Sequence, residues 1–543
     1  MELLPLRSGP VSLRFDARLG SLRYLRIGNE EILRHVYAAV RDENWTTIPA
    51  RIDVETVTST QAEFSIRLRG ICDAPPVRYR WTLDLAGNAS GEIQIRFHGV
   101  AESAFLRNRI GLCLLHPISG GQFERKDSDG TGRMVEFPSE RVSPWQPATD
   151  IAEMRWMTAG GVAVEIQFGG ELFEMEDQRN WGDHSLKTYA TPQHLPKPIR
   201  VHPGEEVHQC MQIRMRAPSA GIWEPIGSVA AFPLAAVPKP RLGLLAGPGD
   251  GLHLPGVRDR LAELRLDHIR VDLRLQARGW KETFRAAAAC AAALRTNLHA
   301  ALFVSGDAAR ELAEVAAITA GSSTAVFLVF QEGAPLTPVS LLELAREMLG
   351  EDAVLAGGSD GLFCEINRNP PSGDAFWLPC FSAMPQAHLT DEETMVENLP
   401  AIADALRTLQ NRLPQPVLIS PISMGPRIPA DPRQETSFGA AWLLGCLRWL
   451  CASANLRSAT LFPTHGPGGV LTASGAPNPP WAVLRFLADA EMLTPWQVTD
   501  FLNVSAVSAC GKVCVANHGR TALEWFGHRL APQQVSVFDS TAG

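Results

Sequence analysis

The feature that most constrains the fold is a regular alternation of strand-like and helix-like segments between residues 241 and 494. The strand-like segments are short apolar runs, at residues 241–245, 268–273, 298–304, 325–330, 353–356, 375–382, 416–420 and 458–462. The helix-like segments are longer and amphipathic, at residues 257–264, 280–294, 308–318, 339–349, 392–413, 435–452 and 480–490. Such alternation is typical of a parallel (β/α)8 TIM-type barrel, which we predict for residues 241–494.

Residues 1–216 have a different pattern, which favours short antiparallel strands. The runs Ser-Ile-Arg-Leu-Arg at 65–69 and Glu-Ile-Gln-Ile-Arg at 92–96 alternate apolar and polar side chains. Strands with one buried and one solvated face have this period. We therefore expect an N-terminal antiparallel β-sandwich. Residues 174–189 mix charges and aromatic rings without a period, and we expect them to form a long ordered loop.

Two shorter segments complete a multidomain α/β and β architecture. Residues 217–240 are rich in Pro, Gly and Ala, which predicts a linker. Residues 495–543 favour strands again but are too few for a separate sandwich. We expect this C-terminal β segment to pack against the barrel or to extend the first sheet.

Composition argues against several classes of partner. The chain has 543 residues, a formal net charge of −8 and no run of Lys and Arg, so we expect neither nucleic acid nor membrane as a partner. The N-terminus has an early acid and an early proline and does not resemble a signal peptide. Ten scattered cysteines without a CxxC motif favour reduced thiols and a cytoplasmic location. The sequence leaves the oligomeric state open.

Polar side chains follow the predicted barrel strands, where barrel enzymes place their active sites. The densest group, which follows strand 5, contains Asp360, Glu365, Asn367 and Arg368. Strands 6, 7 and 8 lead to further candidates, namely Gln386, His388, Arg427 and His465. Strands 2 and 4 end near Asp272, Arg274 and Glu332. Acids, bases, amides and guanidinium groups at one mouth suit a polyhydroxylated small molecule.

Acyl transfer to water would need a base, an acid and donors for an oxyanion. Glu365 is the leading base, with Asp360 as the other carboxylate, and His388 or His465 would be the proton partner. Arg368, Arg427 or Asn367 would hold the oxyanion or the substrate hydroxyls.

Other interpretations of the same residues stay open. Asp360, Glu365, His388 and His465 could instead bind a divalent metal, although no short metal motif is present and the sequence requires no cofactor. A retaining glycoside hydrolase would use paired carboxylates, here Glu332 and Glu365, but strand 7 offers no acid. The third possibility is a carbohydrate-binding protein without activity. Glu365 and Arg368 could also form only a local ion pair, and the charges of residues 174–189 could only pair between domains.

Three motifs resemble the D-apionate lactonase family. They are EDQRNWGDHSLKTY at 176–189, SDGLFCEINRNP at 359–370 and PQAH at 385–388. The segment YAAVRD at 37–42 and LHP at 115–117 are similar too, so the resemblance spans nearly the whole chain. It implies hydrolysis of D-apionolactone to D-apionate on a sandwich–barrel–small β architecture. LFPTHG at 461–466 and SMGP at 423–426 depart from the family pattern at the barrel mouth, where they could alter the substrate.

We therefore expect a lactonase that acts on a sugar-acid lactone by general-base activation of water. Residues 177–187 would fold over the barrel mouth. Besides the residues named above, this segment would contribute substrate-binding side chains from Asp177, Arg179, Asp183 and Lys187.

Overall fold

The computed structural model describes residues 3–217, 230–249, 251–320 and 324–539. These residues divide into two compact units. The first unit ends at Gln178, resumes at His184 and includes the remaining described residues up to 217. The second unit contains the described residues from 230 onward and also the five residues Arg179–Asp183.

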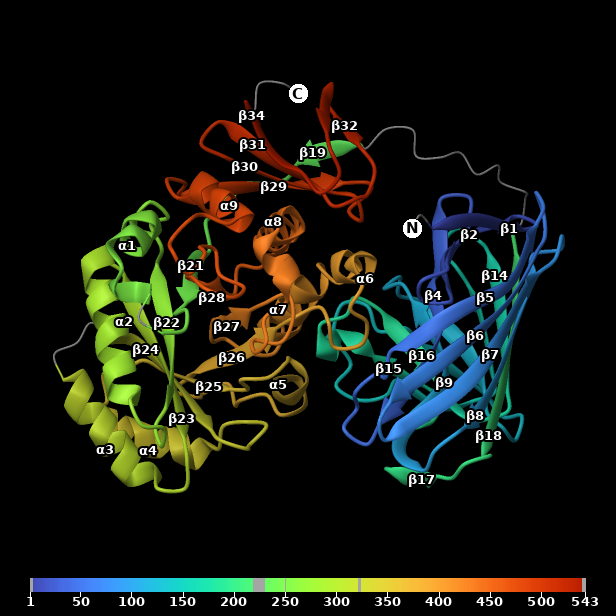
Figure 1. Cartoon of the computed structure of the whole chain (residues 1–543), viewed down its shortest axis with the longest axis horizontal. Helices are drawn as coiled ribbons and strands as arrows, with labels where there is room; N and C mark the ends of the chain where they lie inside the picture. Colours follow the sequence, from blue (N-terminus) through green and yellow to red (C-terminus); the bar gives the residue numbers. More distant parts are fainter. Residues whose placement is uncertain (1–2, 218–229, 250, 321–323, 540–543) are drawn as a thin grey trace. The chain divides into compact units, whose positions relative to one another are not determined.

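The first unit consists of two nine-stranded antiparallel sheets (Figure 1). One sheet has the order β1 (Leu4–Ser8), β2 (Val11–Asp16), β3 (Ser21–Ile27), β4 (Glu30–Asp42), β9 (Phe105–His116), β16 (Leu186–Tyr189), β15 (Phe173–Asp177) and β12 (Ala148–Ile151), with β17 (Ile199–Val201) beside β9. The other has the order β11 (Gly132–Glu136), β10 (Gln122–Lys126), β13 (Glu153–Met157), β14 (Ala163–Gly169), β18 (Glu206–Arg216), β8 (Glu92–Ala101), β7 (Val77–Gly87), β6 (Phe64–Ala74) and β5 (Ala50–Ser59).

The alternation in the sequence explains how these sheets pack. In β6, Phe64, Ile66 and Leu68 are buried, whereas the residues between them are exposed. Apolar side chains from both sheets form one continuous core. This arrangement confirms the predicted antiparallel sheets of the N-terminal region.

The prediction of a long loop at residues 174–189 is wrong for most of that segment. Its two ends are the paired strands β15 and β16, joined through a short 3-10 helix at Gln178–Trp181. The charged residues are buried because cross-strand neighbours satisfy them: Glu174 lies opposite Tyr189, and Glu176 lies opposite Lys187. The Tyr189 hydroxyl donates a hydrogen bond to Glu174, and Lys187 forms an ion pair with Glu176. Charge therefore does not mark a loop here.

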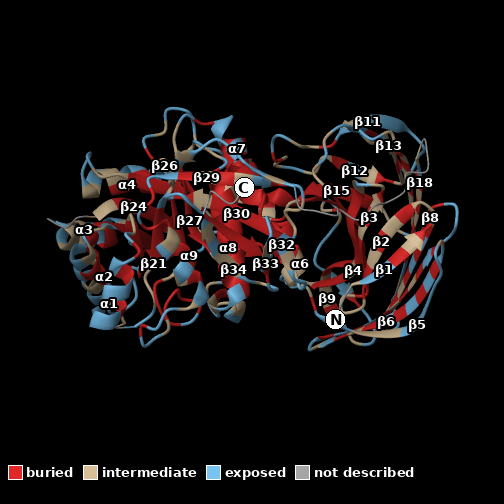
Figure 2. Cartoon of the chain, turned by 90° about the horizontal axis from the view of Figure 1, so that it is seen from above, coloured by how far each residue is buried: buried red, intermediate tan, exposed pale blue. Residues whose placement is uncertain are grey.

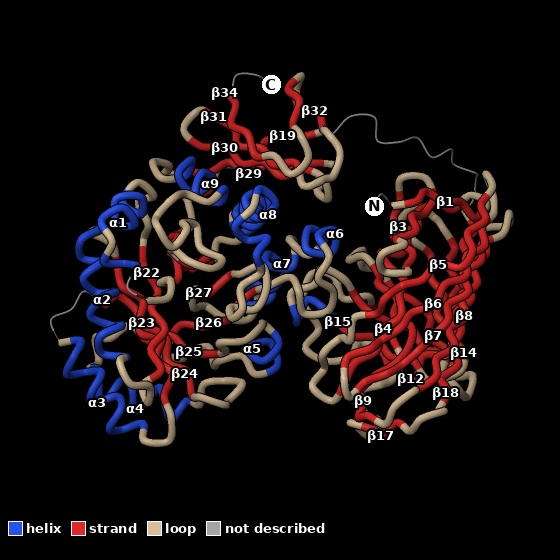
Figure 3. Tube along the Cα trace, viewed as in Figure 1, coloured by secondary structure: helices blue, strands red, loops and turns tan. Residues whose placement is uncertain are grey.

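The second unit contains a closed parallel barrel of eight strands, as predicted (Figure 3). The strands are β21 (Arg241–Leu245), β22 (His268–Arg274), β23 (Asn297–Val304), β24 (Thr324–Gln331), β25 (Leu355–Gly358), β26 (Leu378–Ala383), β27 (Val417–Ile422) and β28 (Leu456–Pro463). The helices between and after them are α1 (Pro255–Ala262), α2 (Trp280–Leu294), α3 (Ala308–Thr319), α4 (Val339–Leu349), α5 (Cys364–Arg368), α6 (Glu392–Glu397), α7 (Ala401–Gln410), α8 (Ser437–Leu450) and α9 (Pro479–Leu487). Figure 2 shows that buried residues are concentrated in the strands, while exposed residues cover the outer faces of α1 to α3.

The single helix predicted at 392–413 is two helices, α6 and α7. Pro400 stands immediately before α7, at its N-cap. A proline lacks the amide hydrogen that an α-helix uses in its interior, so it suits a helix start and ends the preceding one.

The C-terminal tail forms a separate sheet within the second unit. Its strands are β29 (Met492–Val498), β30 (Val504–Ala509), β31 (Lys512–Asn517) and β34 (Val535–Asp539), and a hairpin of β32 (Leu523–Trp525) and β33 (His528–Leu530) lies between the last two. Part of the predicted linker joins this sheet as β19 (Ala231–Pro233) and β20 (Val237–Pro238). Residues 218–229 of that linker lie outside the described residues.

The C-terminal tail was expected either to pack against the barrel or to extend the first sheet, and its contacts with α8 distinguish these two placements. The Arg448 side chain in α8 donates a hydrogen bond from Nε to the Trp496 carbonyl at 3.0 Å. The tail thus packs against the barrel's helices and does not extend the first sheet. No helix among the described residues has the length and apolar character needed to cross a membrane.

Candidate active site

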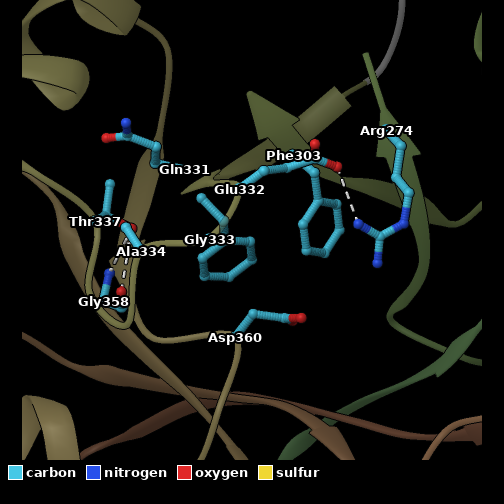
Figure 4. Close-up of a pocket in the computed structure, with 10 residues that line it drawn as sticks. Arg274, Phe303, Gln331, Glu332, Gly333, Ala334, Thr337, Gly358 and Asp360 are labelled. Carbon is cyan, nitrogen blue, oxygen red and sulfur yellow. Dashed lines mark hydrogen bonds and ion pairs between the residues drawn. The ribbon is translucent and has the colours of Figure 1, made fainter. Parts of the chain in front are cut away.

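A cleft of about 210 Å³ opens at the carboxyl ends of barrel strands β22 to β25 (Figure 4). Its lining residues are Arg274, Phe303, Phe330, Gln331, Glu332, Gly333, Ala334, Thr337, Gly358 and Asp360. Two phenylalanine rings form an apolar wall, and two carboxylates bring charge to it. A mixed lining of this kind suits a small ligand with both carbon and hydroxyl surfaces.

Two aspartates and two arginines form a closed ring of ion pairs at this mouth. Arg270 donates from Nε to Asp272 at 2.7 Å and from Nη2 to Asp360 at 2.9 Å. Arg427 donates from Nη1 to the second oxygen of Asp272 at 3.0 Å, and from Nη2 to the second oxygen of Asp360. Each carboxylate therefore bridges both guanidinium groups, and the four charges sum to zero.

Arg270 is the buried anchor of this four-charge ring. Its side chain is fully buried, whereas Asp272, Asp360 and Arg427 are 31%, 21% and 29% exposed. Burial alone would lower the pKa of Arg270, but the carboxylates of Asp272 and Asp360 outweigh it and raise the pKa. Arg270 is therefore a permanent cation that fixes both carboxylates in place.

A chain of hydrogen bonds continues from Arg270 through the barrel interior. Its Nη1 donates to the Ser420 carbonyl at 2.5 Å and to the Ser420 hydroxyl at 3.1 Å. That hydroxyl donates to Thr460 at 2.7 Å, and the Thr460 hydroxyl lies 2.8 Å from Nε2 of His268. Strands β22, β27 and β28 are thereby joined beneath the mouth, which limits the movement of the ring.

The wall formed by β24 and β25 is held by Thr337 and Glu332. The Thr337 hydroxyl lies 2.6 Å from the Val329 carbonyl and 3.1 Å from the Gly358 carbonyl, and it accepts the Gly358 amide at 3.3 Å. Glu332 accepts from Arg274 at 3.0 Å, as the dashed line in Figure 4 marks. Barrel strand β24 is thus followed by an ion pair that faces the cleft.

His388, on the loop that follows β26, forms a His–Asp dyad with Asp183. Nδ1 of His388 lies 2.5 Å from one Asp183 oxygen, and the other oxygen accepts the Asn398 amide at 2.9 Å. Both side chains of the dyad are nearly buried, at 8% and 4% exposure. A carboxylate in this position fixes the orientation and tautomer of the imidazole, which is what a general base needs.

Asp183 lies beside His388 because residues 179–183 pack within the second unit, together with the barrel. The Asn367 side chain donates to the Asn180 side chain at 2.8 Å, and Arg412 donates to the Asn367 side chain at 2.9 Å. Arg179 lies 3.8 Å from Asp404 and is fully buried. Asn367 and Arg179, both predicted to bind substrate, therefore have contacts that hold this segment in place.

The remaining predicted residues of this unit lie in three other places. Glu365 and Arg368 lie within α5, 4.0 Å apart, and Arg368 lies over the ring of Trp181. Gln386 donates to the Met424 carbonyl and to Asp431, both at 2.6 Å, and so links the loops that follow β26 and β27. The latter loop carries Arg427.

His465 packs against the turn that follows β21. Its Nδ1 lies 2.9 Å from the Thr464 hydroxyl, and its Nε2 lies 3.2 Å from the Pro248 carbonyl. Burial lowers the pKa of His465, so it is neutral near pH 7. A Cβ on Gly251 would approach Nε2 to 2.0 Å, which shows how closely the turn encloses the ring.

Asp177 and Lys187 belong to the first unit. Asp177 accepts the Ser143 amide at 2.8 Å, and Lys187 pairs with Glu176 between β15 and β16. Burial lowers the pKa of Lys187, while the Glu176 carboxylate opposes that shift. Their predicted contact with substrate stays a prediction.

The predicted metal ligands do not form one group. Asp360 lies in the four-charge ring, and Glu365, His388 and His465 each have the separate contacts described above. Among the described residues, the clusters with metal-ligand spacing are His98, Glu206 and His208 in one place, and Asp267, His268 and His299 in another.

The sequence interpretation missed Arg270, although the pattern contains a signal for it. Strand β22 reads His-Ile-Arg-Val-Asp-Leu-Arg, in which Arg270, Asp272 and Arg274 occur at every second position. The residues between them, Val271 and Leu273, pack in the core. In a barrel strand, this period places all three charged side chains on one face.

Comparisons with known proteins assign both parts of the chain to one family. A family model described as "D-apionate lactonase, N-terminal domain" matches residues 2–218, and one described as "D-apionate lactonase, TIM barrel domain" matches residues 242–492. The D-apionate lactonase of Brucella anthropi is 27% identical over 519 residues, which cover 87% of this chain and 84% of that protein.

Solved structures with a similar arrangement are distant. A GH30 endoxylanase from Clostridium papyrosolvens has a TM-score of 0.36 and 13% identity over 55% of this chain and 84% of its own. A family 39 glycoside hydrolase from Bacteroides cellulosilyticus has a TM-score of 0.35 and 11% identity over 75% of this chain and 87% of its own. Neither bears on the reaction. Because the two family models together span both the sandwich and the barrel, the chain belongs to the D-apionate lactonase family of enzymes.

Proposed function

We propose that this protein hydrolyses a sugar-acid lactone, D-apionolactone or a close analogue, at the carboxyl end of its barrel. Family membership supports a lactonase, and the Asp183–His388 dyad is the observation that carries the mechanism. A lactone is an ester, so its hydrolysis needs a base for water and a cation for the oxyanion.

In the proposed reaction, neutral His388 accepts a proton from water while the water oxygen bonds to the lactone carbonyl carbon. The carbonyl electrons move to its oxygen, and a guanidinium group, Arg427 or Arg368, stabilises that oxyanion. When the tetrahedral intermediate collapses, the ring C–O bond breaks and the leaving alkoxide takes the proton from His388. The products are a carboxylic acid and a hydroxyl, and ionisation of the acid releases one proton to the solvent.

Glu365 is the competing base, as the sequence predicts. Glu365 is a partly exposed carboxylate that lies 4.0 Å from Arg368, whereas Nδ1 of His388 lies 2.5 Å from the Asp183 carboxylate. The geometry therefore favours His388, with Glu365 and Arg368 as substrate-binding residues on α5. Asp360, through the four-charge ring, would bind the substrate hydroxyls.

The test is proton release from a panel of aldonolactones that includes D-apionolactone, with and without EDTA, beside a set of aryl glycosides. Three variants accompany the native chain: His388→Gln, Glu365→Gln and the exposed control His202→Gln. We expect release with lactones, loss of turnover in His388→Gln and native turnover in the control.

Two results would contradict the proposal. Full activity of His388→Gln together with loss in Glu365→Gln would transfer the role of base to Glu365. Turnover of aryl glycosides instead of lactones would favour a glycoside hydrolase, with Glu332 as one carboxylate. Strand β27 and the following Ser423 contain no carboxylate that could serve as the second.

A further inference from the structure

Two histidines and a glutamate converge on the outer face of the sandwich, within the first unit. His98 in β8 and His208 in β18 are cross-strand partners, and Glu206 precedes His208 by two residues on the same face. Strands β8 and β18 lie side by side in their sheet (Figure 1). Nε2 of His98 lies 3.2 Å and Nε2 of His208 lies 2.9 Å from the same oxygen of Glu206.

The three ligand atoms all lie within 4.8 Å of one another, a spacing that a tetrahedral metal ion can bridge. Zinc binds histidine nitrogen and carboxylate oxygen at about 2.1 Å, so tetrahedral geometry places neighbouring ligand atoms about 3.4 Å apart. The observed N···O distances of 3.2 and 2.9 Å are within about half an ångström of that value. We propose that His98, His208 and Glu206 form a surface site for a divalent transition metal of the zinc class, with water as the remaining ligand.

The exposure of the three side chains lets them complete this geometry. The two imidazole rings are stacked, with centroids 4.3 Å apart and planes 10° apart, so each ring must tilt before both lone pairs meet at one ion. His98, Glu206 and His208 are 42%, 51% and 65% exposed, and the tilt therefore needs no repacking of the core.

A second cluster with metal-ligand spacing, formed by Asp267, His268 and His299, does not have exposed side chains that can tilt in this way. His268 and His299 stack at 3.8 Å and 11° inside the barrel, and both are buried. Nε2 of His268 is already within hydrogen-bonding distance of Thr460. Their lone pairs lie in parallel planes that packing holds in place, so this cluster, which also contains Asp267, fits a metal less well.

The chemistry of the exposed cluster favours zinc-class ions over calcium or magnesium. Two of its three donors are imidazole nitrogens, whereas calcium and magnesium prefer oxygen. Metal binding would replace the Nε2 protons, so protons compete with the metal for these ligands.

Cys210 is the neighbouring residue that could imitate such a site. It is an exposed free thiol on the same face of β18, two residues after His208. It lies outside the cluster of mutually close ligand atoms. Cys210→Ser is therefore the matched control, because it removes a strong zinc ligand nearby without touching the proposed site.

The experiment is calorimetric titration of the metal-free full-length chain with Zn²⁺ at pH 7.5 and pH 5.5. The variants are His98→Ala, His208→Ala, Glu206→Gln and Cys210→Ser. We expect one equivalent to bind at pH 7.5, at least about tenfold more weakly at the lower pH. Each histidine variant should lose at least about tenfold in affinity, because loss of an outer-shell partner alone costs 10–100-fold. Glu206→Gln should weaken binding, and Cys210→Ser should bind as the native chain does.

Co²⁺ absorption provides a second readout that does not depend on heat. The proposed ligand set predicts weak d–d bands without the intense thiolate-to-cobalt band that Cys210 would add. The proposal is overturned if the native chain binds no Zn²⁺, if both histidine variants retain native affinity, or if Cys210→Ser abolishes binding. Lactone turnover should be unchanged in His98→Ala and His208→Ala, so this test stands apart from that of the proposed reaction.

Discussion

Replacing Arg270 by methionine should destabilise the second unit, because the four-charge ring would lose its buried cation. Methionine keeps most of the side-chain volume, so packing changes little while the charge is removed. Asp272 and Asp360 would then share Arg427 alone. Removing one partner of a buried ion pair costs about 3–5 kcal/mol.

The solvent exposure of the Asp272 and Asp360 carboxylates determines where in this range of about 3–5 kcal/mol the loss of unfolding free energy should fall. Asp272 and Asp360 are 31% and 21% exposed, so water can partly solvate the unpaired charge. We therefore expect a loss of about 3 kcal/mol in the free energy of unfolding. At about 2 °C per kcal/mol, the melting temperature of this unit would fall by about 6 °C.

The double variant Arg270→Met with Asp360→Asn tests the reason for this loss. It leaves one arginine and one aspartate, Arg427 and Asp272, which can still pair. The second substitution should therefore cost less in the variant than in the native chain, with a coupling energy of about 1–3 kcal/mol. Thermal unfolding of the native chain, the two single variants and the double variant, followed by calorimetry, measures all four corners of the cycle.

Either of two results would refute the reasoning. A loss of less than about 1 kcal/mol in Arg270→Met would show that the ring is not a buried charge network. Strict additivity in the double variant would show that Arg270 and Asp360 do not interact, despite the 2.9 Å between their atoms.

Three further predictions concern other residues. Asp183→Asn should lower kcat by about 100-fold or more, with a smaller change in KM and a shifted pH profile, because the base loses its orienting carboxylate; an unchanged kcat in steady-state assays would contradict this. Burial lowers the pKa of His518 to about 4, so below pH 6.5 only the unfolded chain gains a proton there, and stability should fall by up to about 1.4 kcal/mol per pH unit down to pH 4. His518→Gln should flatten that dependence in melting temperatures measured from pH 4.5 to 7, and equal slopes in both proteins would argue against it. Thr337→Val should cost about 1–3 kcal/mol in urea unfolding, because the Gly358 amide loses its acceptor in the cleft wall, and a neutral effect would show that water replaces the hydroxyl.

Where local signals and packing agree, the sequence predicts elements to the residue. Helix α2 was expected at Trp280–Leu294 and helix α4 at Val339–Leu349, and both have those bounds. Pro338 precedes α4 and Gly350 follows it, so the ends are set by residues that do not continue a helix. The same rule identifies Pro400 as a helix start, which the prediction of one helix at 392–413 did not use.

Strands β15 and β16 show where local signals are insufficient. Phe173 and Met175 do alternate with Glu174 and Glu176, but a strand with charges on one face is expected to expose that face. Here the charged face is buried too, because each charge has a partner on the neighbouring strand. Such pairing depends on a residue more than ten positions away, which periodicity does not reveal.

In the candidate site, too, local sequence signals predict the position of a side chain but not its contacts. Position after a barrel strand predicts which side chains face the mouth, and Asp360 and Arg427 were found in this way. It does not predict partners: Arg270 and Asp360 are 90 residues apart, and Asp183 and His388 are 205 residues apart. Closure of the barrel brings Arg270 beside Asp360. The packing of residues 179–183 within the barrel's unit brings Asp183 beside His388.

The two candidate bases, Glu365 and His388, illustrate this difference between position and contacts. Glu365 stands out in the sequence because charged and amide residues crowd around it, and its nearest charged contact is Arg368, only three residues away. The orienting carboxylate of His388, in contrast, comes from residues that interrupt the sandwich sequence. Local crowding reports which residues are polar together, whereas a general base depends on one fixed partner. A chain that kept residues 359–370 but lost 179–183 would therefore retain the conspicuous motif and lose the dyad, and with it the proposed reaction.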